Sequence, residues 1–377
     1  MSQALSSRGH TVHIVTYPIG QDIPVEGVTI HRTRAAFGKK KVAVGPTWYK
    51  PYLDILLVVK LCKVIRQEKI DIIHAHNYEG ALAGFIAKII TGKPMLYNAV
   101  NTMADELPSY NFIRPKALAV ILARFLDTIV PKMGDYITVV SEELHQFMLE
   151  KKISPDMLAI VPAGVNPGMF EGKDPDMMRR RYRIGERPLI IYTGTLDRFQ
   201  RIDLLLKAMR VVLDSVRNAV LLIVGNIISS ADLNQHKQLA GEIGIAENVI
   251  FTDEGRLEDI PFFLASADIA VIPRPSCPGF PVKLLNYMAA EKAIVTFEGS
   301  AKGLTHMKNA LIVKNEDWQG FGQSVVCLLQ DRGLMQSLGR EARRTVSDAF
   351  DWRILAGKIE DIYRKILKEK GIYDNET

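Results

Sequence analysis

Two hydrophobic periods alternate along the 377 residues of this chain. Short apolar runs are followed by longer stretches in which apolar residues recur at helical spacing. This alternation is typical of βαβ units, which build parallel sheets. The pattern therefore predicts an α/β protein.

In the first half of the chain, the apolar runs predict strands at 11–17, 28–33, 71–76, 94–99, 135–141 and 158–163. Helical spacing predicts helices near 48–68, 79–91, 115–132 and 141–151.

The second half restarts the same pattern, with strands predicted at 189–194, 220–225, 248–253, 268–273, 293–297 and 310–314. Helices are predicted near 201–216, 231–243, 258–266, 281–291 and 317–330, and the amphipathic tail at 351–371 predicts a final helix.

Each half therefore predicts its own doubly wound sheet, and the chain is too long for one compact core. Gly, Pro and Asp cluster at Asn166–Asp176, which marks the boundary. We expect an N-terminal domain at 1–168 and a C-terminal domain at 169–351. Ligands of open α/β sheets bind at the carboxyl edge of the strands, so function is expected in the loops after strands.

The first residues depart from this pattern. MSQALSSRGHTVHIVTY predicts half a helix, a turn at Gly9 and then a strand. An α/β sheet usually opens on a strand, and none precedes this helix. Either the fold begins late, or a first strand and its loop are missing.

The charge and cysteine content limit which ligands and which compartment suit the protein. Forty-eight Lys and Arg against 42 Asp and Glu give a net charge of +6, which suits anionic small molecules or an anionic membrane surface. The excess is too small and too evenly spread to argue for nucleic acid. The three cysteines (62, 277 and 327) offer neither a disulfide framework nor a zinc spacing, so a reducing cytoplasm is expected.

The loop after the strand at 189–194 is the first candidate anion site. Gly194 allows a tight turn, Thr195 offers a hydroxyl and an N–H, and Arg198 and Arg201 stand near a helix start. A plain βα loop with solvated arginines explains the same pattern and is favoured on pattern alone.

The second candidate is DIAVIPRPSCPGFPVKLLNYMAAEKAIV. Arg274 follows a strand directly, Gly279 permits close backbone approach, and Pro281 suits a first helical position. The N–H groups of the next three residues, Val282 to Leu284, would face the loop, and Lys283 adds a charge. This set fits a phosphate-bearing ligand. A helix-start turn with an ordinary surface lysine is the equally supported alternative.

Nine motifs spread along the chain are similar to those of a known protein family. In order, RGHTVHIVT, DIIHAHN, GKPMLYNAVNT, IVPAGVNPGMF, YTGTL, LLIVG, ADIAVIPR, PGFPVKLLNYMAAEKAIV and a closing FDW resemble the family-4 retaining glycosyltransferases of the GT-B architecture. The resemblance implies two Rossmann-like domains facing a cleft and a UDP- or GDP-sugar held mainly by the C-terminal domain. It also implies a final helix at about 352–372 that packs back on the N-terminal domain. It implies no tightly bound cofactor and no obligatory metal.

The sequence departs from the family where the chemistry is expected. Two glutamates eight positions apart are replaced by Pro278 and Asn286. The arginine and lysine of the first loop are replaced by Thr195 and Gln200, and a histidine by Val100. The Gly-rich first loop of the family has no counterpart, so we expect the first strand to be missing.

These departures leave two interpretations open. In the first, the chain is an active hexosyltransferase-type variant in which Lys283 and Arg274 neutralise the leaving diphosphate and Asn286 binds ribose hydroxyls. We favour it, with surface polysaccharide or glycolipid assembly in the cell envelope as the setting. In the second, the chain is a non-catalytic homologue that binds sugar nucleotide or a partner glycosyltransferase.

The predicted donor-binding residues are Gly194, Thr195, Gln200, Arg201, Gly225, Arg256, Gly279, Phe280, Pro281, Val282, Lys283, Leu284 and Asn286.

We assign binding of the sugar acceptor to loops in the first half of the chain. His76 and Asn77 end a strand, and Asn101 and Glu106 lie in a polar loop after another. His74 and His76 could form a metal pair, but lining or packing is favoured because no further ligand cluster supports a metal. For the loop at 101–110, a solvated loop is an equally supported interpretation.

A membrane role is suggested by Lys39–Lys41 and the Trp48–Tyr49 pair before the helix at 48–68. The apolar stripe of that helix is more often core packing. The lysines and aromatic residues suit an anionic surface. We expect weak peripheral association with the inner face of the cytoplasmic membrane, where a glycan or lipid-linked acceptor would lie.

Overall fold

The computed structural model describes residues 1–19, 23–34, 49–110, 113–225, 230–252, 255–277 and 280–372. The chain forms two compact units, which are considered separately. The first comprises Met1–Pro162 with Trp352–Thr377, and the second is Ala163–Asp351. The boundary therefore precedes the predicted 168/169. Val165 precedes the predicted boundary, but its N–H donates to the carbonyl of Phe350. This hydrogen bond ties the start of the segment from Ala163 to the second unit.

In the first unit, every predicted apolar run forms a strand, but the strands make two sheets. One pairs β1 (Val12–Thr16) with β2 (Val28–Arg32) in parallel. The other is parallel in the order β3-β4-β5-β6. Its strands are β3 (Ile73–His76), β4 (Met95–Ala99), β5 (Tyr136–Val139) and β6 (Leu158–Ile160). The single doubly wound sheet predicted here is therefore interrupted between β1 and β3.

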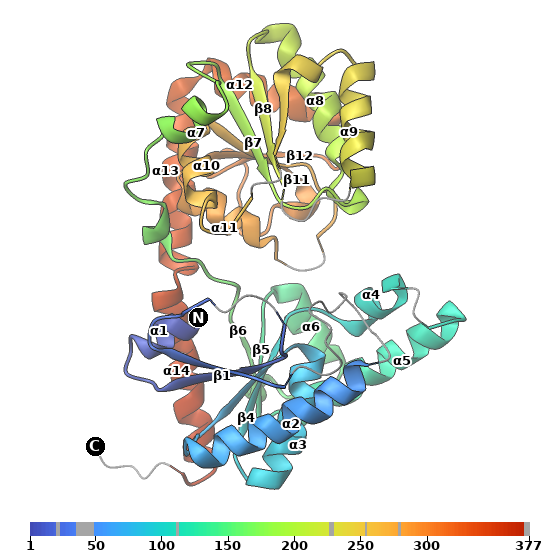
Figure 1. Cartoon of the computed structure of the whole chain (residues 1–377), viewed down its shortest axis with the longest axis vertical. Coiled ribbons are helices and arrows are strands. Elements are labelled where there is room, and N and C mark those ends of the chain that lie inside the picture. The colour runs from blue at the N-terminus through green and yellow to red at the C-terminus, as the bar shows by residue number, and fades with distance from the viewer. Residues whose placement is uncertain are drawn as a thin grey trace. The chain divides into compact units, whose positions relative to one another are not determined.

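The helices of the first unit are α1 (Ser2–Ser6), α2 (Lys50–Gln67), α3 (Asn77–Thr91), α4 (Met103–Glu106), α5 (Lys116–Ile129), α6 (Glu142–Glu150) and α14 (Trp352–Glu369). Figure 1 shows α2 and α3 side by side, and their apolar residues pack on β3 and β4. Helices α1 and α14 pack together against Leu96, Tyr136 and Val161. The final helix thus joins the core of the first unit.

The second unit has one six-stranded sheet in the order β12-β11-β10-β7-β8-β9, with all pairs parallel. Its strands are β7 (Leu189–Thr193), β8 (Val220–Val224), β9 (Val249–Thr252), β10 (Ile269–Ile272), β11 (Ala293–Phe297) and β12 (Leu311–Val313). All five residues of β7, at the centre, are buried. This arrangement confirms the predicted fold class, α/β with parallel sheets in two domains.

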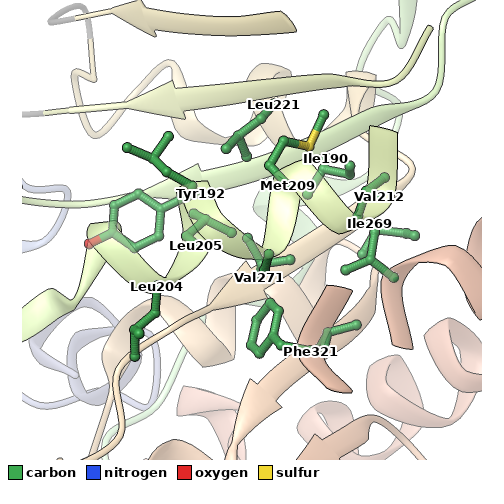
Figure 2. Close-up of a cluster of buried hydrophobic side chains, with 14 of the residues drawn as sticks. Ile190, Tyr192, Leu204, Leu205, Met209, Val212, Leu221, Ile269, Val271 and Phe321 are labelled. Carbon is green, nitrogen blue, oxygen red and sulfur yellow. The ribbon is translucent and has the colours of Figure 1, made fainter. Parts of the chain in front are cut away.

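Helices cover both faces of this sheet (Figure 1). They are α7 (Asp176–Arg181), α8 (Ile202–Ser215), α9 (Ser230–Glu242), α10 (Ile260–Ser266), α11 (Val282–Ala289), α12 (Trp318–Gln330) and α13 (Arg332–Ala349). One core lies between the sheet and α8 and α12, and Figure 2 shows part of it. The second core lies on the other face, under α7, α10, α11 and α13.

None of the helices in the described part of the chain is long and apolar enough to cross a membrane.

Candidate donor site and acceptor-side loops

The loop after β7 closes tightly around a glycine. The N–H of Gly194 donates to the carbonyl of Val224 at 2.9 Å, so the loop stays bound to the neighbouring strand. Gly194 has φ +136°, and a Cβ there would lie 2.5 Å from Nζ of Lys283. The backbone conformation therefore favours glycine, and a Cβ would in addition displace the end of this lysine.

Lys283 reaches this loop from α11. Its Nζ donates to Oη of Tyr192 at 2.9 Å and to Oε1 of Gln200 at 3.2 Å. The same Nζ lies 4.2 Å from the centroid of the Tyr192 ring. Among the described residues, Lys283 forms no ion pair, and no carboxylate contributes to the shift of its pKa. Lys283 is thus held by neutral partners, with its charge unbalanced.

Burial and the nearby charge of Arg274 lower the pKa of Lys283 from 10.5 to about 7. A buried ammonium is disfavoured by loss of hydration, and a like charge adds to the effect. An anionic ligand would reverse both influences. The free site therefore holds a lysine that titrates near neutral pH, and ligand binding would favour its charged form.

Arg274 follows β10 and stands beside this lysine. Its Nε donates to the carbonyl of Ser276 at 2.6 Å, and its guanidinium lies 4.7 Å from the centroid of the Phe199 ring. Oγ of Ser300, which is buried, donates to the carbonyl of Arg274 at 2.7 Å. These contacts fix the backbone and the stem of Arg274.

Helix α11 begins at Val282, so Pro281 is its N-cap and not, as predicted, its first helical residue. Val282 is exposed and Leu284 is fully buried, so the helix turns its first residue outward and anchors itself through the third. Oη of Tyr287 accepts from the N–H of Thr193 at 2.8 Å and ties α11 to the end of β7. Of the three predicted N–H groups, that of Leu284 already donates to the carbonyl of Pro281 at 2.8 Å, so its predicted role as a donor to the ligand is not supported. The N–H groups of Val282 and Lys283 have no acceptor within the helix and are the ones an anion could meet.

The other predicted donor residues are divided between this loop cluster and its surroundings. Asn286 is half-buried one turn after Lys283, and the carbonyl of Thr195 accepts from Oη of Tyr192 at 2.8 Å. Phe280 packs on the Phe350 ring with centroids 5.4 Å apart. Gly279 lies outside the described residues, as does Pro278.

Two of the arginines predicted to bind the donor, Arg201 and Arg256, make other contacts than with Lys283 and its partners. Arg201 pairs with Asp203 at 3.0 Å and with Glu316 at 2.6 Å, so two carboxylates balance its charge. Arg256 is largely exposed near Glu258, at 3.8 Å. Gly225, by contrast, sits in close backbone packing, because its carbonyl accepts from the N–H of Gly255 at 3.0 Å.

The described residues of this cluster gather a lysine without a counter-ion, a second cation and the start of a helix at the carboxyl ends of β7 and β10. We call Tyr192, Gly194, Gln200, Arg274 and Lys283 the lysine cluster. Such a set binds an anion by charge and by N–H donation.

In the first unit, the predicted acceptor-side residues lie at the ends of β3 and β4. The rings of His74 and His76 stack with centroids 4.4 Å apart, and the side-chain amide of Asn98 donates to His76 at 3.0 Å. His74 lies 2.7 Å from Oη of Tyr363. Burial and the nearby α-amino group lower the pKa of His76 to about 4. Asn77 begins α3 with φ +61°.

The loop at 101–106 is fixed by a residue that the sequence did not single out. Asp127 of α5 is fully buried and accepts from the N–H groups of Met103 at 2.8 Å and Ala104 at 3.0 Å and from the hydroxyl of Tyr78. Asn101 donates to Glu106 at 2.6 Å. Asp127 thereby sets the position of both predicted acceptor-side residues in this loop.

We expect Asp127→Ala to lower the free energy of unfolding by at least about 2 kcal/mol, because one buried and two partly buried donors lose their acceptor. Urea unfolding of the full chain measures this. Asp71→Ala, at an exposed position, is the control and should change the free energy by less than about 0.5 kcal/mol. Equal stability of the two variants would show that Asp127 does not hold the loop.

One group of possible metal ligands occurs in the described residues: His13, His31 and Glu68, whose ligand atoms lie within 4.8 Å of one another. The two imidazoles already face each other at 2.9 Å. Burial, His13 and the charge of Lys60 lower the pKa of His31. The charge of Lys60 opposes a cation beside His31 and that of Glu68 favours one, so these contacts do not support assigning a metal to the group.

Comparison with known proteins identifies the family. Residues 175–345 match the model for group 1 glycosyl transferases, and residues 1–168 match the model for glycosyltransferase family 4. Together the two models span nearly the whole chain, and the lysine cluster falls within the first. The chain belongs to the glycosyltransferase family that these two models describe. Its two parallel-sheet units are those of the GT-B fold.

Individual proteins agree with this family. The enzyme is 29% identical over 218 residues to a GDP-mannose-dependent α-(1-6)-phosphatidylinositol monomannoside mannosyltransferase of Mycobacterium tuberculosis. That match covers 55% of this chain and 56% of the relative, so it spans about half the length of each.

Two solved structures share the fold. Sucrose-phosphate synthase from Thermosynechococcus elongatus has a TM-score of 0.80 at 17% identity, covering 98% of this chain and 92% of that one. The Anabaena HepE protein in complex with UDP-glucose has a TM-score of 0.70 at 13% identity, covering 94% and 99%.

Two tyrosines of the candidate donor site were not predicted from the sequence. Tyr192 supplies the ring and hydroxyl beneath Lys283, and Figure 2 shows its ring within the hydrophobic cluster with the hydroxyl oxygen at the edge. Tyr287 joins α11 to β7. A tyrosine in an otherwise aliphatic strand or helix face was the available signal, since a buried hydroxyl needs a partner.

Proposed function

We propose that this glycosyltransferase moves a hexose-type sugar from a UDP- or GDP-sugar to a glycan, glycolipid or lipid-linked acceptor, with retention of configuration. The observation that carries the proposal is Lys283, held beside Gly194 by Tyr192 and Gln200 with no counter-ion in the part of the chain that the structure describes. A diphosphate supplies the negative charge that this lysine lacks. The family resemblance supports retention and a setting in cell-envelope polysaccharide assembly.

The lysine cluster also explains how an active site can lack the usual basic pair. Gln200 occupies the position where the family has lysine, and its side chain accepts a hydrogen bond from Lys283. A cation therefore stands beside that position, but it comes from α11. We propose that Lys283 replaces the missing lysine as the principal charge on the donor diphosphate.

Glycosyl transfer breaks the bond between the anomeric carbon and the diphosphate, so negative charge develops on the leaving oxygen. Lys283, Arg274 and the first N–H groups of α11 would stabilise that charge. The donor phosphate would take the acceptor proton, and Asn286 would hydrogen-bond the ribose. This scheme uses residues of the chain alone and needs no obligatory metal and no tightly bound cofactor.

The donor class is tested by calorimetric titration of a panel of UDP- and GDP-sugars, followed by assay of nucleoside diphosphate release. We expect binding of at least one sugar nucleotide and release of its nucleoside diphosphate when an acceptor is present. Binding of no member of the panel would contradict a UDP- or GDP-sugar donor. Binding without release under any acceptor would favour the non-catalytic alternative.

We propose in addition that the acceptor side meets an anionic membrane, which would place the enzyme at the inner face of the cytoplasmic membrane. The predicted Lys39–Lys41 segment lies outside the described residues. The proposal therefore rests on helix α5. The exposed apolar residues of this helix are Leu118, Ile121, Leu122, Phe125 and Ile129. Lys116 and Arg124 are exposed beside them, and the one acid of the helix, Asp127, is buried. An apolar face flanked by cations suits an anionic lipid surface.

We expect the double variant Ile121→Ser, Phe125→Ser to bind vesicles containing anionic phosphatidylglycerol at least tenfold less than the unmodified chain, because two apolar side chains lose their burial in lipid. Vesicle sedimentation measures this. Ile89→Ser, at an exposed position on α3, is the matched control and should bind normally. Unchanged binding by the double variant would remove α5 as the membrane face.

A further inference from the structure

Uncharged groups hold the guanidinium of Arg274 in the part of the chain that the structure describes. Its Nε donates to the carbonyl of Ser276 at 2.6 Å, and the centroid of the Phe199 ring lies 4.7 Å from the guanidinium carbon. Among the described residues, Arg274 forms no ion pair. The ring of Phe199 is therefore a principal contact of this charge.

A neutral contact differs from an ion pair in what it leaves for a ligand. Arg201 is held by Asp203 and Glu316, and these two carboxylates balance its charge. An aromatic face attracts a cation through the quadrupole of the ring and does not cancel the charge. Arg274 is thus held in place while its charge stays available to an anion.

Phe199 belongs to a turn that also holds Lys283. The turn is the 3-10 helix η5 (Arg198–Gln200), which follows β7. Gln200 is buried, its N–H donates to the carbonyl of Asp197 at 2.8 Å, and its Oε1 accepts from Nζ of Lys283 at 3.2 Å. Neighbouring residues of one turn therefore contact both cations of the lysine cluster.

The two cations repel each other, and Arg274 accordingly lowers the pKa of Lys283. An arginine side chain also loses much rotamer freedom when it is fixed. Both effects favour a guanidinium that moves away from Lys283 and into solvent. A ring that holds the guanidinium in place before a ligand arrives reduces the cost of binding that ligand.

Phe199 contributes little to the core, because 53% of the residue is exposed. Single exposed apolar residues are common on protein surfaces and do not by themselves indicate a role. Here the indication comes from the guanidinium over the ring. Because the side chain is exposed, substitutions at this position should leave the fold intact.

We propose that Phe199 is a positioning residue whose ring holds the guanidinium of Arg274 beside Lys283, so that both cations meet the donor diphosphate together. This inference rests on the proposed function, because the diphosphate is the anion of that proposal. Phe199 acts through Arg274 and needs no contact of its own with the donor.

The contact is tested first without ligand, by ¹⁵N relaxation of the Arg274 Nε–H group in the full chain. We expect this group to become more mobile in Phe199→Leu and when Phe199 is replaced by trifluorophenylalanine, and to stay as rigid in Phe199→Tyr as in the unmodified chain. Fluorination weakens the ring quadrupole with little change of size, so a role in packing alone would not respond to it. Equal mobility in the unmodified chain and in Phe199→Leu would overturn the inference.

The effect on the ligand is tested by calorimetric titration of inorganic pyrophosphate. Phe199→Leu and the trifluorophenylalanine variant should each bind it about three- to tenfold more weakly, and Phe199→Tyr should bind it normally. In an Arg274→Ala background, Phe199→Leu should have no further effect. Trifluorophenylalanine at Phe147, whose ring centroid lies 5.1 Å from Nζ of Lys151 in the first unit, is the matched control and should leave the affinity unchanged.

Three results of the titration would overturn the inference. They are an unmodified chain that does not bind pyrophosphate, an affinity that does not respond to fluorination of Phe199, and a full effect of Phe199→Leu in the Arg274→Ala background. Pyrophosphate carries neither base nor sugar. A failure of the proposed UDP- or GDP-sugar donor would therefore appear in the titration of sugar nucleotides and can be told apart from a failure of this inference.

Discussion

Lys283→Ala is expected to lower kcat/KM for sugar transfer by about 10²- to 10³-fold. This is the range found when a preorganised group that stabilises developing negative charge is removed. The expected effect is large because Lys283 has no counter-ion among the described residues, and because Arg201, another cation of the same loop, is not free to replace it. Arg201 is balanced by Asp203 and Glu316.

The assay is initial-rate release of nucleoside diphosphate with the donor found by titration. Lys207→Ala, which removes an exposed lysine from α8 of the same unit, is the control and should retain full activity. Matching thermal unfolding of the two variants excludes a folding defect. A Lys283→Ala enzyme within threefold of the unmodified rate would show that the donor charge is met elsewhere.

Gly194→Ala is expected to lower the free energy of unfolding by about 1–3 kcal/mol and to weaken donor binding at least tenfold. The loss of stability comes from φ +136°, a conformation that residues with a Cβ rarely adopt. The loss of binding comes from Lys283, whose Nζ would lie 2.5 Å from the new Cβ. A lysine end moves easily, so the clash displaces the ammonium and disturbs its contacts with Tyr192 and Gln200.

Gly241→Ala is the matched control, because that glycine is in α9 and a Cβ there meets nothing within 4 Å. It should leave stability unchanged or slightly higher, since alanine favours helix. Normal donor affinity in Gly194→Ala would show that the close approach of Lys283 to the loop is not needed for binding.

Much of the fold could be predicted because it depends on local periodicity. All twelve strands of the described residues coincide with apolar runs. Helix α13 was missed, since its stretch is strongly basic and polar, although Leu338, Ala342 and Val346 recur at a spacing of four and are buried. The break between β1 and β3 could not be predicted in three dimensions, but the absence of a strand before α1 pointed to it.

The site was predicted less completely because it depends on contacts between distant residues. Pattern placed Lys283 at a helix start, but not its bond to Gln200, 83 positions away, or its place over the ring of Tyr192. Neither could sequence reveal that carboxylates balance Arg201 or that Asp127 organises the loop at 101–106. Such side-chain pairings arise from the tertiary fold.

The measurement that tests the central claim most directly is titration of UDP and GDP into the unmodified chain and Lys283→Ala at pH 7 and pH 9. Lys283 has a pKa of about 7 in the free site, and a bound diphosphate favours the protonated form. Binding therefore takes up a proton above pH 7, and affinity falls as the pH rises.

Over these two pH units we expect the better-bound nucleotide to lose between ten- and a hundredfold in affinity for the unmodified chain. Lys283→Ala should bind it weakly at both pH values, with little difference between them. An unmodified chain whose affinity is independent of pH, or a Lys283→Ala variant that binds as tightly as the unmodified chain, would contradict the role of Lys283 as the cation for the donor diphosphate.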